Sequence, residues 1–205
     1  MKHVYRTTAL LAATLALAGC GSDSDSGSMP GMNHSSSSTP AATPTAAGFN
    51  DADVSFATQM IPHHQQAVQM ASMAGYQATT PEVKQLATAI KAAQDPEIKL
   101  MSGWLTSWGK PVPTPSHGGH GGSEEMPGMM TEEEMSDLGK QKGSMFDRMW
   151  IQMMIKHHQG AVTMAKTEQA DGQDAASIAL AKKIQAAQTA EIATMQRLLG
   201  RLPVG

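Results

Sequence analysis

Apolar residues recur every three or four positions in four stretches of the chain, which is the spacing of an amphipathic α-helix. Thr80 followed by Pro81 is a typical helix start, and Gly200 is typical of the position just beyond a helix end. The acidic segment 131–138 is expected to be a turn before the third helix. No stretch alternates with the two-residue period of a β-strand, so the pattern predicts an all-α fold. The predicted helices cover approximately residues 50–74, 80–109, 144–170 and 174–199.

The second half of the chain repeats the first with an offset of 94 residues. The segment MIPHHQQAVQMA (60–71) returns as MIKHHQGAVTMA (154–165), and IKAAQDPEI (90–98) returns as IQAAQTAEI (184–192). Each repeat contains two of the predicted helices, so the repeating unit is a helical hairpin. Two hairpins bury their apolar stripes most simply against each other, which predicts a four-helix bundle with pseudo-twofold symmetry.

The bundle is expected to occupy residues 50–203. It consists of repeat one (50–109), a linker rich in His, Gly and Met (110–130) and repeat two (131–203). A stretch of Ser, Gly, Pro, Thr and Ala without periodicity (21–49) precedes it and is expected to be a flexible tether.

The first twenty residues (1–20) have the form of a bacterial lipoprotein signal peptide. Lys2 and Arg6 precede an apolar run at 8–18, which is too short to span a bilayer. The run ends in Leu-Ala-Gly-Cys, so Cys20 is expected to become the first mature residue and to carry the lipid. This predicts an exported, membrane-anchored lipoprotein on the periplasmic or extracellular face. Because Cys20 is the only cysteine, the exported part forms no internal disulfide and offers no thiolate ligand.

Both histidine pairs of the repeated motif lie on the apolar face of their predicted helices. A buried imidazole belongs either to a hydrogen-bonded polar network or to a metal site, and imidazole is the commonest protein metal ligand. Methionines flank each pair at the same two positions, and thioethers bind soft metals. Two equivalent pairs favour metal binding, and a purely structural polar network is the alternative. The predicted ligands are Met60, His63, His64, Met70, Met154, His157, His158 and Met164.

Four carboxylates share these inward faces: Asp53, Glu97, Asp147 and Glu191. A carboxylate in an apolar core is costly unless it is paired or bound to metal. We expect these four to orient the histidines as hydrogen-bond acceptors rather than to touch the metal.

Methionine and histidine also gather outside the predicted helices, in segments where packing offers no explanation. Solvent-exposed methionine with histidine suits copper, because thioethers bind Cu(I) and imidazoles bind Cu(I) or Cu(II). The cysteine patterns of tetrahedral zinc sites are missing. Copper is therefore the predicted metal, with Cu(I) favoured over Cu(II). Weak linker sites are predicted at Met29, Met32, His34, His117, His120, Met126, Met129 and Met130.

Three segments, MPGMMTEEEMSDL, FDRMWIQMMIKHHQGAVTMA and IQAAQTAEIATM, resemble the domain-of-unknown-function family 305. The resemblance covers both repeats, about residues 51–200. It implies a duplicated ferritin-like helical bundle of an exported bacterial protein, and copper binding through Met and His. Di-iron ferritin-like proteins place a glutamate three residues before the ligand histidine. Here Met60 and Met154 stand at that position, which argues against a di-iron oxidase.

The function predicted from the sequence is sequestration or buffering of copper at the cell envelope by a lipid-anchored protein. A copper-transfer partner is expected but its identity is not indicated. The net charge is −3 and no basic patch is visible, so nucleic acid is not an expected ligand. No nucleophile–base pair or nucleotide-binding loop is visible, so no enzymatic activity is expected. Two alternatives are a metal-dependent oxidase of the ferritin-like type and a metal-free envelope interaction module.

Overall fold

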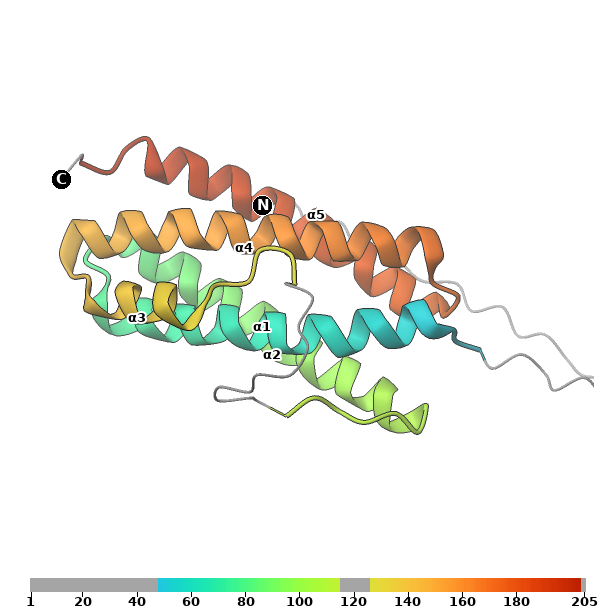
Figure 1. The fold of residues 1–205 in the computed structure, drawn as a ribbon. Coiled ribbons are helices and arrows are strands. Elements are labelled where there is room, and N and C mark those ends of the chain that lie inside the picture. Colours follow the sequence, from blue (N-terminus) through green and yellow to red (C-terminus); the bar gives the residue numbers. More distant parts are fainter. Residues whose placement is uncertain (1–47, 115–125, 204–205) are drawn as a thin grey trace, which may run out of the picture. The chain divides into compact units, whose positions relative to one another are not determined.

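The computed structural model describes residues 48–114 and 126–203, and these residues form five helices and no strand. The helices are α1 (Asp51–Gln77), α2 (Pro81–Ser107), α3 (Glu132–Lys140), α4 (Gly143–Asp171) and α5 (Ala175–Leu199). The four long helices form the predicted bundle, so the all-α fold class is confirmed (Figure 1). The predicted signal peptide and nearly all of the predicted tether lie outside the described residues.

The bundle is built from two hairpins, α1 with α2 and α4 with α5 (Figure 1). Helices α1 and α4 lie side by side and run in opposite directions, and two contacts fix their register. The rings of His63 and His157 stack with centroids 3.8 Å apart, and the indole Nε1 of Trp150 donates to the carbonyl oxygen of Met70 at 2.9 Å. The two His-His motifs therefore meet at the middle of the α1–α4 pair.

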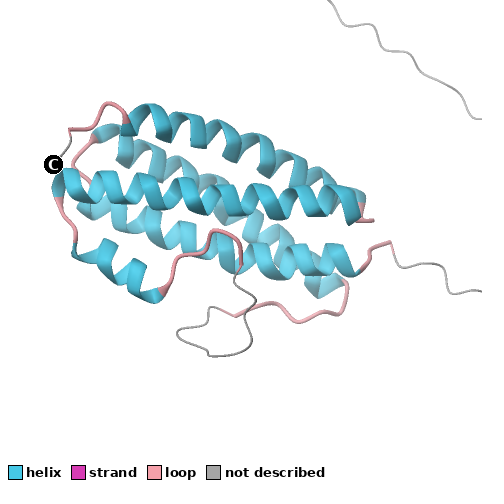
Figure 2. Cartoon of the chain, turned by 45° about the horizontal axis from the view of Figure 1, so that its top comes forward, coloured by secondary structure: helices cyan, strands magenta, loops and turns pink. Residues whose placement is uncertain are grey.

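The acidic segment predicted to be a turn is instead the short helix α3 (Figure 2). A reciprocal capping box starts it: the backbone N–H of Glu134 donates to the Thr131 hydroxyl at 3.1 Å, and the backbone N–H of Thr131 donates to the Glu134 carboxylate at 2.7 Å. Leu138 is fully buried against α1 and α4. The chain then turns at Gly143, whose φ of 62° is easily adopted only by glycine.

Two apolar clusters form the core, one on each side of a polar layer that contains the four motif histidines. Each buried Leu, Ile, Met or Phe side chain contributes about 1.5–3 kcal/mol to folding. The Trp150 cluster includes Met70, Ile90, Met130, Leu138, Phe146, Trp150, Met153, Met154 and Met195. The Phe56 cluster includes Phe56, Met60, Ile61, Met101, Leu105, Met164, Leu180 and Ile184.

Two fully buried aspartates hold the hairpin loops. The carboxylate of Asp147 accepts hydrogen bonds from the backbone N–H and hydroxyl of both Thr79 and Thr80, at 2.6 to 3.3 Å. The carboxylate of Asp53 accepts from the backbone N–H groups of residues 173–174, at 2.9 to 3.2 Å. Each aspartate therefore fixes the hairpin loop of the other repeat. The sequence predicted that both orient the histidines, and the structure corrects this.

Glu168 is also buried, next to Asp53. Burial raises the pKa of Glu168 to about 7 from an ordinary value of 4.5, and the nearby negative charge of Asp53 adds to the shift. The folded protein therefore holds this proton at pH values where the unfolded chain has lost it. The stability that protonated Glu168 contributes to the folded state is fully present below about pH 4.5 and is lost as the pH rises through 7.

We expect Glu168→Gln to stabilise the protein at pH 8 by about 1–3 kcal/mol and to leave its stability unchanged at pH 4. Glutamine removes the ionisation but keeps the size and a hydrogen-bonding group. Thermal melts between pH 4 and pH 8 measure the difference, with Glu133→Gln on the exposed face of α3 as control. An equal shift at both pH values would show that Glu168 does not titrate between them.

Candidate metal centre

The four motif histidines are fully buried in the polar layer. His63 on α1 and His157 on α4 stack at its centre with their planes 38° apart. His158 lies beside His157, with ring centroids 6.3 Å apart. The sequence predicted that the two motifs face inward, and the antiparallel register of α1 and α4 brings them together.

A glutamate from the second helix of each hairpin holds one histidine of each pair. His64 Nε2 lies 2.9 Å from the carboxylate of Glu97, and His158 Nε2 lies 2.7 Å from that of Glu191. A carboxylate only accepts, so in both pairs Nε2 carries a hydrogen and donates it. Histidines that bind metals usually donate their other N–H to such an acceptor, which fixes the ring orientation.

The Glu97 carboxylate has a second partner, Lys183 of α5, at 3.3 Å. Burial by itself would raise the pKa of Glu97, but the hydrogen bonds from His64 and Lys183 outweigh it and the pKa is lowered. Glu97 is therefore ionised at neutral pH. No sequence pattern pointed to Lys183, because its contact depends on where the folded bundle places α5 relative to Glu97 on α2.

Five buried ring nitrogens lack a well-formed hydrogen bond: both nitrogens of His157, and Nδ1 of His63, His64 and His158. Buried polar atoms are nearly always paired, and each unpaired one costs about 1–3 kcal/mol. Burial lowers the pKa of His63 to about 3 and that of His157 well below its usual value, and neighbouring imidazoles add to both shifts. These rings are therefore neutral, with lone pairs available to a metal ion.

The histidines alone do not form a ready-made cage. Among the described residues, no three His, Asp or Glu side chains converge closely enough to hold an ion. Further donors must come from sulfur, and two thioethers are near. Met60 and Met154 are fully buried on the turn that precedes each histidine pair. An ion bound here would combine imidazole and thioether ligands.

Met70 and Met164 are not brought to the histidines. Each lies six residues beyond the second histidine of its own motif, about 9 Å along the helix axis. Met70 packs in the Trp150 cluster and Met164 in the Phe56 cluster. Each cluster thus contains one flanking methionine from each motif, and these two methionines are farther from the polar layer than Met60 and Met154.

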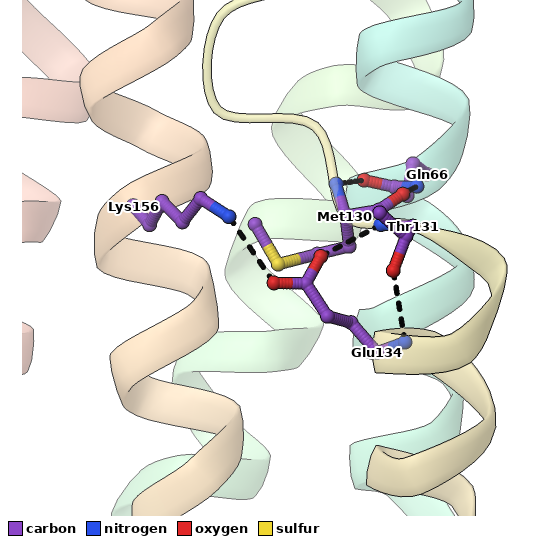
Figure 3. Close-up of polar contacts among 5 residues, drawn as sticks. All are labelled: Gln66, Met130, Thr131, Glu134 and Lys156. Carbon is purple, nitrogen blue, oxygen red and sulfur yellow. Dashed lines mark hydrogen bonds and ion pairs between the residues drawn. The ribbon is translucent and has the colours of Figure 1, made fainter.

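Met130 was predicted to be an exposed linker ligand, and the structure corrects this. Its side chain is 5% exposed and belongs to the Trp150 cluster. Its backbone N–H donates to Gln66 Oε1 and its carbonyl accepts from Gln66 Nε2, both at 2.8 Å (Figure 3). Met130 therefore has a packing role that composition could not reveal. Met126 and Met129 are partly buried in the same segment.

The linker residues just before Met130 pack against α4 and contact His63 of α1, at the level of the histidines. His63 Nε2 donates to the carbonyl oxygen of Pro127 at 3.1 Å. A Cβ atom on Gly160 would lie 1.8 Å from that oxygen, so only glycine admits the linker here. Gly128 has a φ of 79°, which also favours glycine. The sequence signal was present, because repeat one has Gln66 where repeat two has Gly160.

The remaining predicted sites lie outside the described residues: Cys20, Met29, Met32, His34, His117 and His120. They stay predictions from the sequence. Within the described ranges, no helix combines the length and apolar character needed to cross a membrane.

Comparison with known proteins assigns the chain to a family. The chain is similar to a DUF305 protein of Streptomyces coelicolor described as secreted, with 34% identity, a TM-score of 0.66 and coverage of 73% of this chain and 91% of that one. A DUF305 fragment from Deinococcus radiodurans has 31% identity, a TM-score of 0.66 and coverage of 75% and 98%. No curated protein matches the sequence.

A third similar structure is CopM in its Cu(II)-bound form, with 38% identity, a TM-score of 0.63 and coverage of 72% of this chain and 95% of that one. CopM has also been crystallised in Cu(I)-bound, Ag-bound and apo forms. The DUF305 family, described as a domain of unknown function, matches residues 53–199, which include both repeats. The chain therefore belongs to the DUF305 family, as its motifs indicated.

Proposed function

We propose that this protein binds copper at the buried histidine layer and sequesters or buffers it outside the cytoplasm, anchored to the membrane by lipid on Cys20. The observation that carries the proposal is the set of five buried ring nitrogens without partners, next to the thioethers of Met60 and Met154. Metal binding would satisfy one nitrogen on each ring, because a neutral imidazole has a single lone pair for an ion. The copper- and silver-bound forms of the similar protein CopM support the choice of metal.

The donor set favours Cu(I). Thioether sulfur and neutral imidazole are soft or intermediate ligands, whereas Fe(II) in ferritin-like oxidases is held mainly by carboxylates. Glu97 and Glu191 are already engaged by histidine, and the two aspartates hold the hairpin loops. The copper is cargo in this proposal, and we assign no catalytic step to it.

The test is an anaerobic titration of the purified mature chain with Cu(I) in the presence of a competing chelator. Parallel melts with Ag(I), Zn(II) and Fe(II) rank the metals, because a ligand at 100 times its Kd stabilises the folded state by about 2.7 kcal/mol. We expect Cu(I) and Ag(I) to give the largest shifts. A larger shift with Fe(II), together with oxygen consumption, would favour the oxidase. Melting unchanged by any metal would favour the metal-free interaction module.

The anchor has a separate test. We expect the wild-type protein in the membrane fraction and the Cys20→Ala variant outside it, because that variant cannot receive the lipid. Equal membrane retention of both proteins would contradict lipid anchoring without affecting the metal site.

A further inference from the structure

A row of methionines on α4 connects the protein surface to the histidine layer. Met145, Met149 and Met153 occur at intervals of four residues, and His157 follows at the next interval. Met145 is 61% exposed, Met149 is partly buried, Met153 is 8% exposed and His157 is fully buried. Residues four apart lie on successive turns, about 6 Å apart along the helix axis. The row therefore winds inward from solvent toward the buried imidazoles.

The outer end of the row lies in a surface pocket. Met145 and Met149 both line it, together with Gln141, Arg148 and Gln152. Arg148 Nη1 donates to the carbonyl oxygens of Leu199 and Leu202, at 3.4 and 3.2 Å, so part of its guanidinium is engaged by the end of α5 and the residues after it. Two neutral thioethers in a solvent-accessible pocket suit the capture of a soft cation.

The inner end of the row reaches free ligands. Met153 belongs to the Trp150 cluster, one turn before His157. Both ring nitrogens of His157 are buried, and neither makes a well-formed hydrogen bond. A metal ion that reaches Met153 is therefore one helical turn from the His157 imidazole, which stacks on His63 at the centre of the polar layer.

The fold does not require thioethers at these positions. The repeat offset of 94 residues places Asp51, Ser55 and Gln59 at the equivalent positions of α1, and all three are exposed. Contact with α3 accounts for apolar side chains at Met149 and Met153, since Met149 packs against the cluster that contains Leu138. It does not account for the exposed Met145, nor for the choice of methionine at three successive positions.

We propose that Met145, Met149 and Met153 form a transfer route that carries Cu(I) from the surface pocket to His157. At each step the ion forms a bond to the next sulfur, and finally to a ring nitrogen, as its bond to the preceding sulfur breaks. The copper stays Cu(I) throughout, so no electron is transferred, and thioethers exchange no proton. The inference rests on the proposed copper-binding function and adds the way in which the buried site is filled.

The experiment compares rate with affinity in the full mature protein. The variant Met145→Leu/Met149→Leu/Met153→Leu conserves volume, which such substitutions tolerate at a cost below about 1.5 kcal/mol. Cu(I) is supplied anaerobically from a coloured chelator complex, and its transfer is followed by stopped-flow absorbance. We expect loading to slow at least about tenfold, a barrier increase of about 1.4 kcal/mol, with the equilibrium affinity unchanged. The control variant Met101→Leu/Met195→Leu replaces two buried methionines outside the row and should load at the wild-type rate.

Three outcomes overturn the route. An unchanged loading rate in the triple variant shows that copper enters elsewhere. A parallel loss of affinity shows that these sulfurs are storage ligands rather than a path. Absence of copper binding in the wild-type protein refutes the proposed function itself, and is distinguished from failure of the route because the control and wild-type proteins then also take up no metal.

Discussion

Replacing His63 and His157 together with leucine will weaken copper binding at least about 100-fold and leave the metal-free protein no less stable than the wild type. Loss of a group that merely orients a ligand already costs about 10–100-fold in metal affinity, so loss of two ligands should cost more. The stability follows from the unpaired nitrogens. The two rings bury three nitrogens without partners and make one hydrogen bond, to Pro127. Leucine removes those unsatisfied groups.

Replacing the other two histidines, His64 and His158, is expected to lower the stability of the metal-free protein. Replacing His64 and His158 with leucine leaves the carboxylates of Glu97 and Glu191 without their closest partners. We expect that variant to lose copper and also about 1–3 kcal/mol of metal-free stability. Chelator competition and urea denaturation measure the two quantities.

Gln69→Leu/Gln159→Leu is the matched control for both histidine variants, because these exposed side chains flank the same motifs. It should change neither copper affinity nor stability by much. If both histidine pairs prove equally destabilising and copper binds all variants equally, the polar layer is a structural network and the metal-free alternative is correct.

The four long helices could be predicted from the sequence because each has 25 to 29 residues and a long apolar stripe. The same method failed for α3. A helix of nine residues with one fully buried side chain, Leu138, has too few turns to show a period. Its capping box, Thr131 with Glu134, was the available signal. Short helices depend on caps and tertiary contacts more than on periodicity.

The sequence predicted which way each site residue points around its helix, but not its level along the bundle axis. A helical projection gives the angle of each side chain around the axis, and it correctly placed His63, His157 and Asp147 on inward faces. The projection does not show which inward residues of different helices lie at the same level along the bundle axis. Asp147 and His157 are ten residues apart, about 15 Å along α4, so they cannot share a site. Glu97 meets His64 only because the turn between α1 and α2 brings the two residues to the same level along the bundle axis. A helical projection of one helix does not contain that information.

The Asp147→Ala variant tests whether this inward-facing aspartate acts on the hairpin loop or on the histidines. The substitution leaves the backbone N–H groups and hydroxyls of Thr79 and Thr80 without their acceptor in a buried loop. We expect a loss of about 2–4 kcal/mol, because unsatisfied buried donors each cost about 1–3 kcal/mol and some will find water. For a domain of this size that corresponds to a fall of roughly 6–12 °C in melting temperature.

Copper affinity should not change in Asp147→Ala at temperatures where it is folded, because the carboxylate contacts a loop rather than a histidine. Asp137→Ala is the control: its side chain makes an exposed ion pair with Lys140 on α3, and such pairs contribute about 0–1 kcal/mol. Differential scanning calorimetry and chelator competition on the same samples separate stability from affinity. A protein of wild-type stability with weakened copper binding would restore the sequence-based interpretation, in which the aspartate orients a histidine. A destabilised protein with unchanged affinity would establish that the duplicated hairpins use this carboxylate to hold each other's loops.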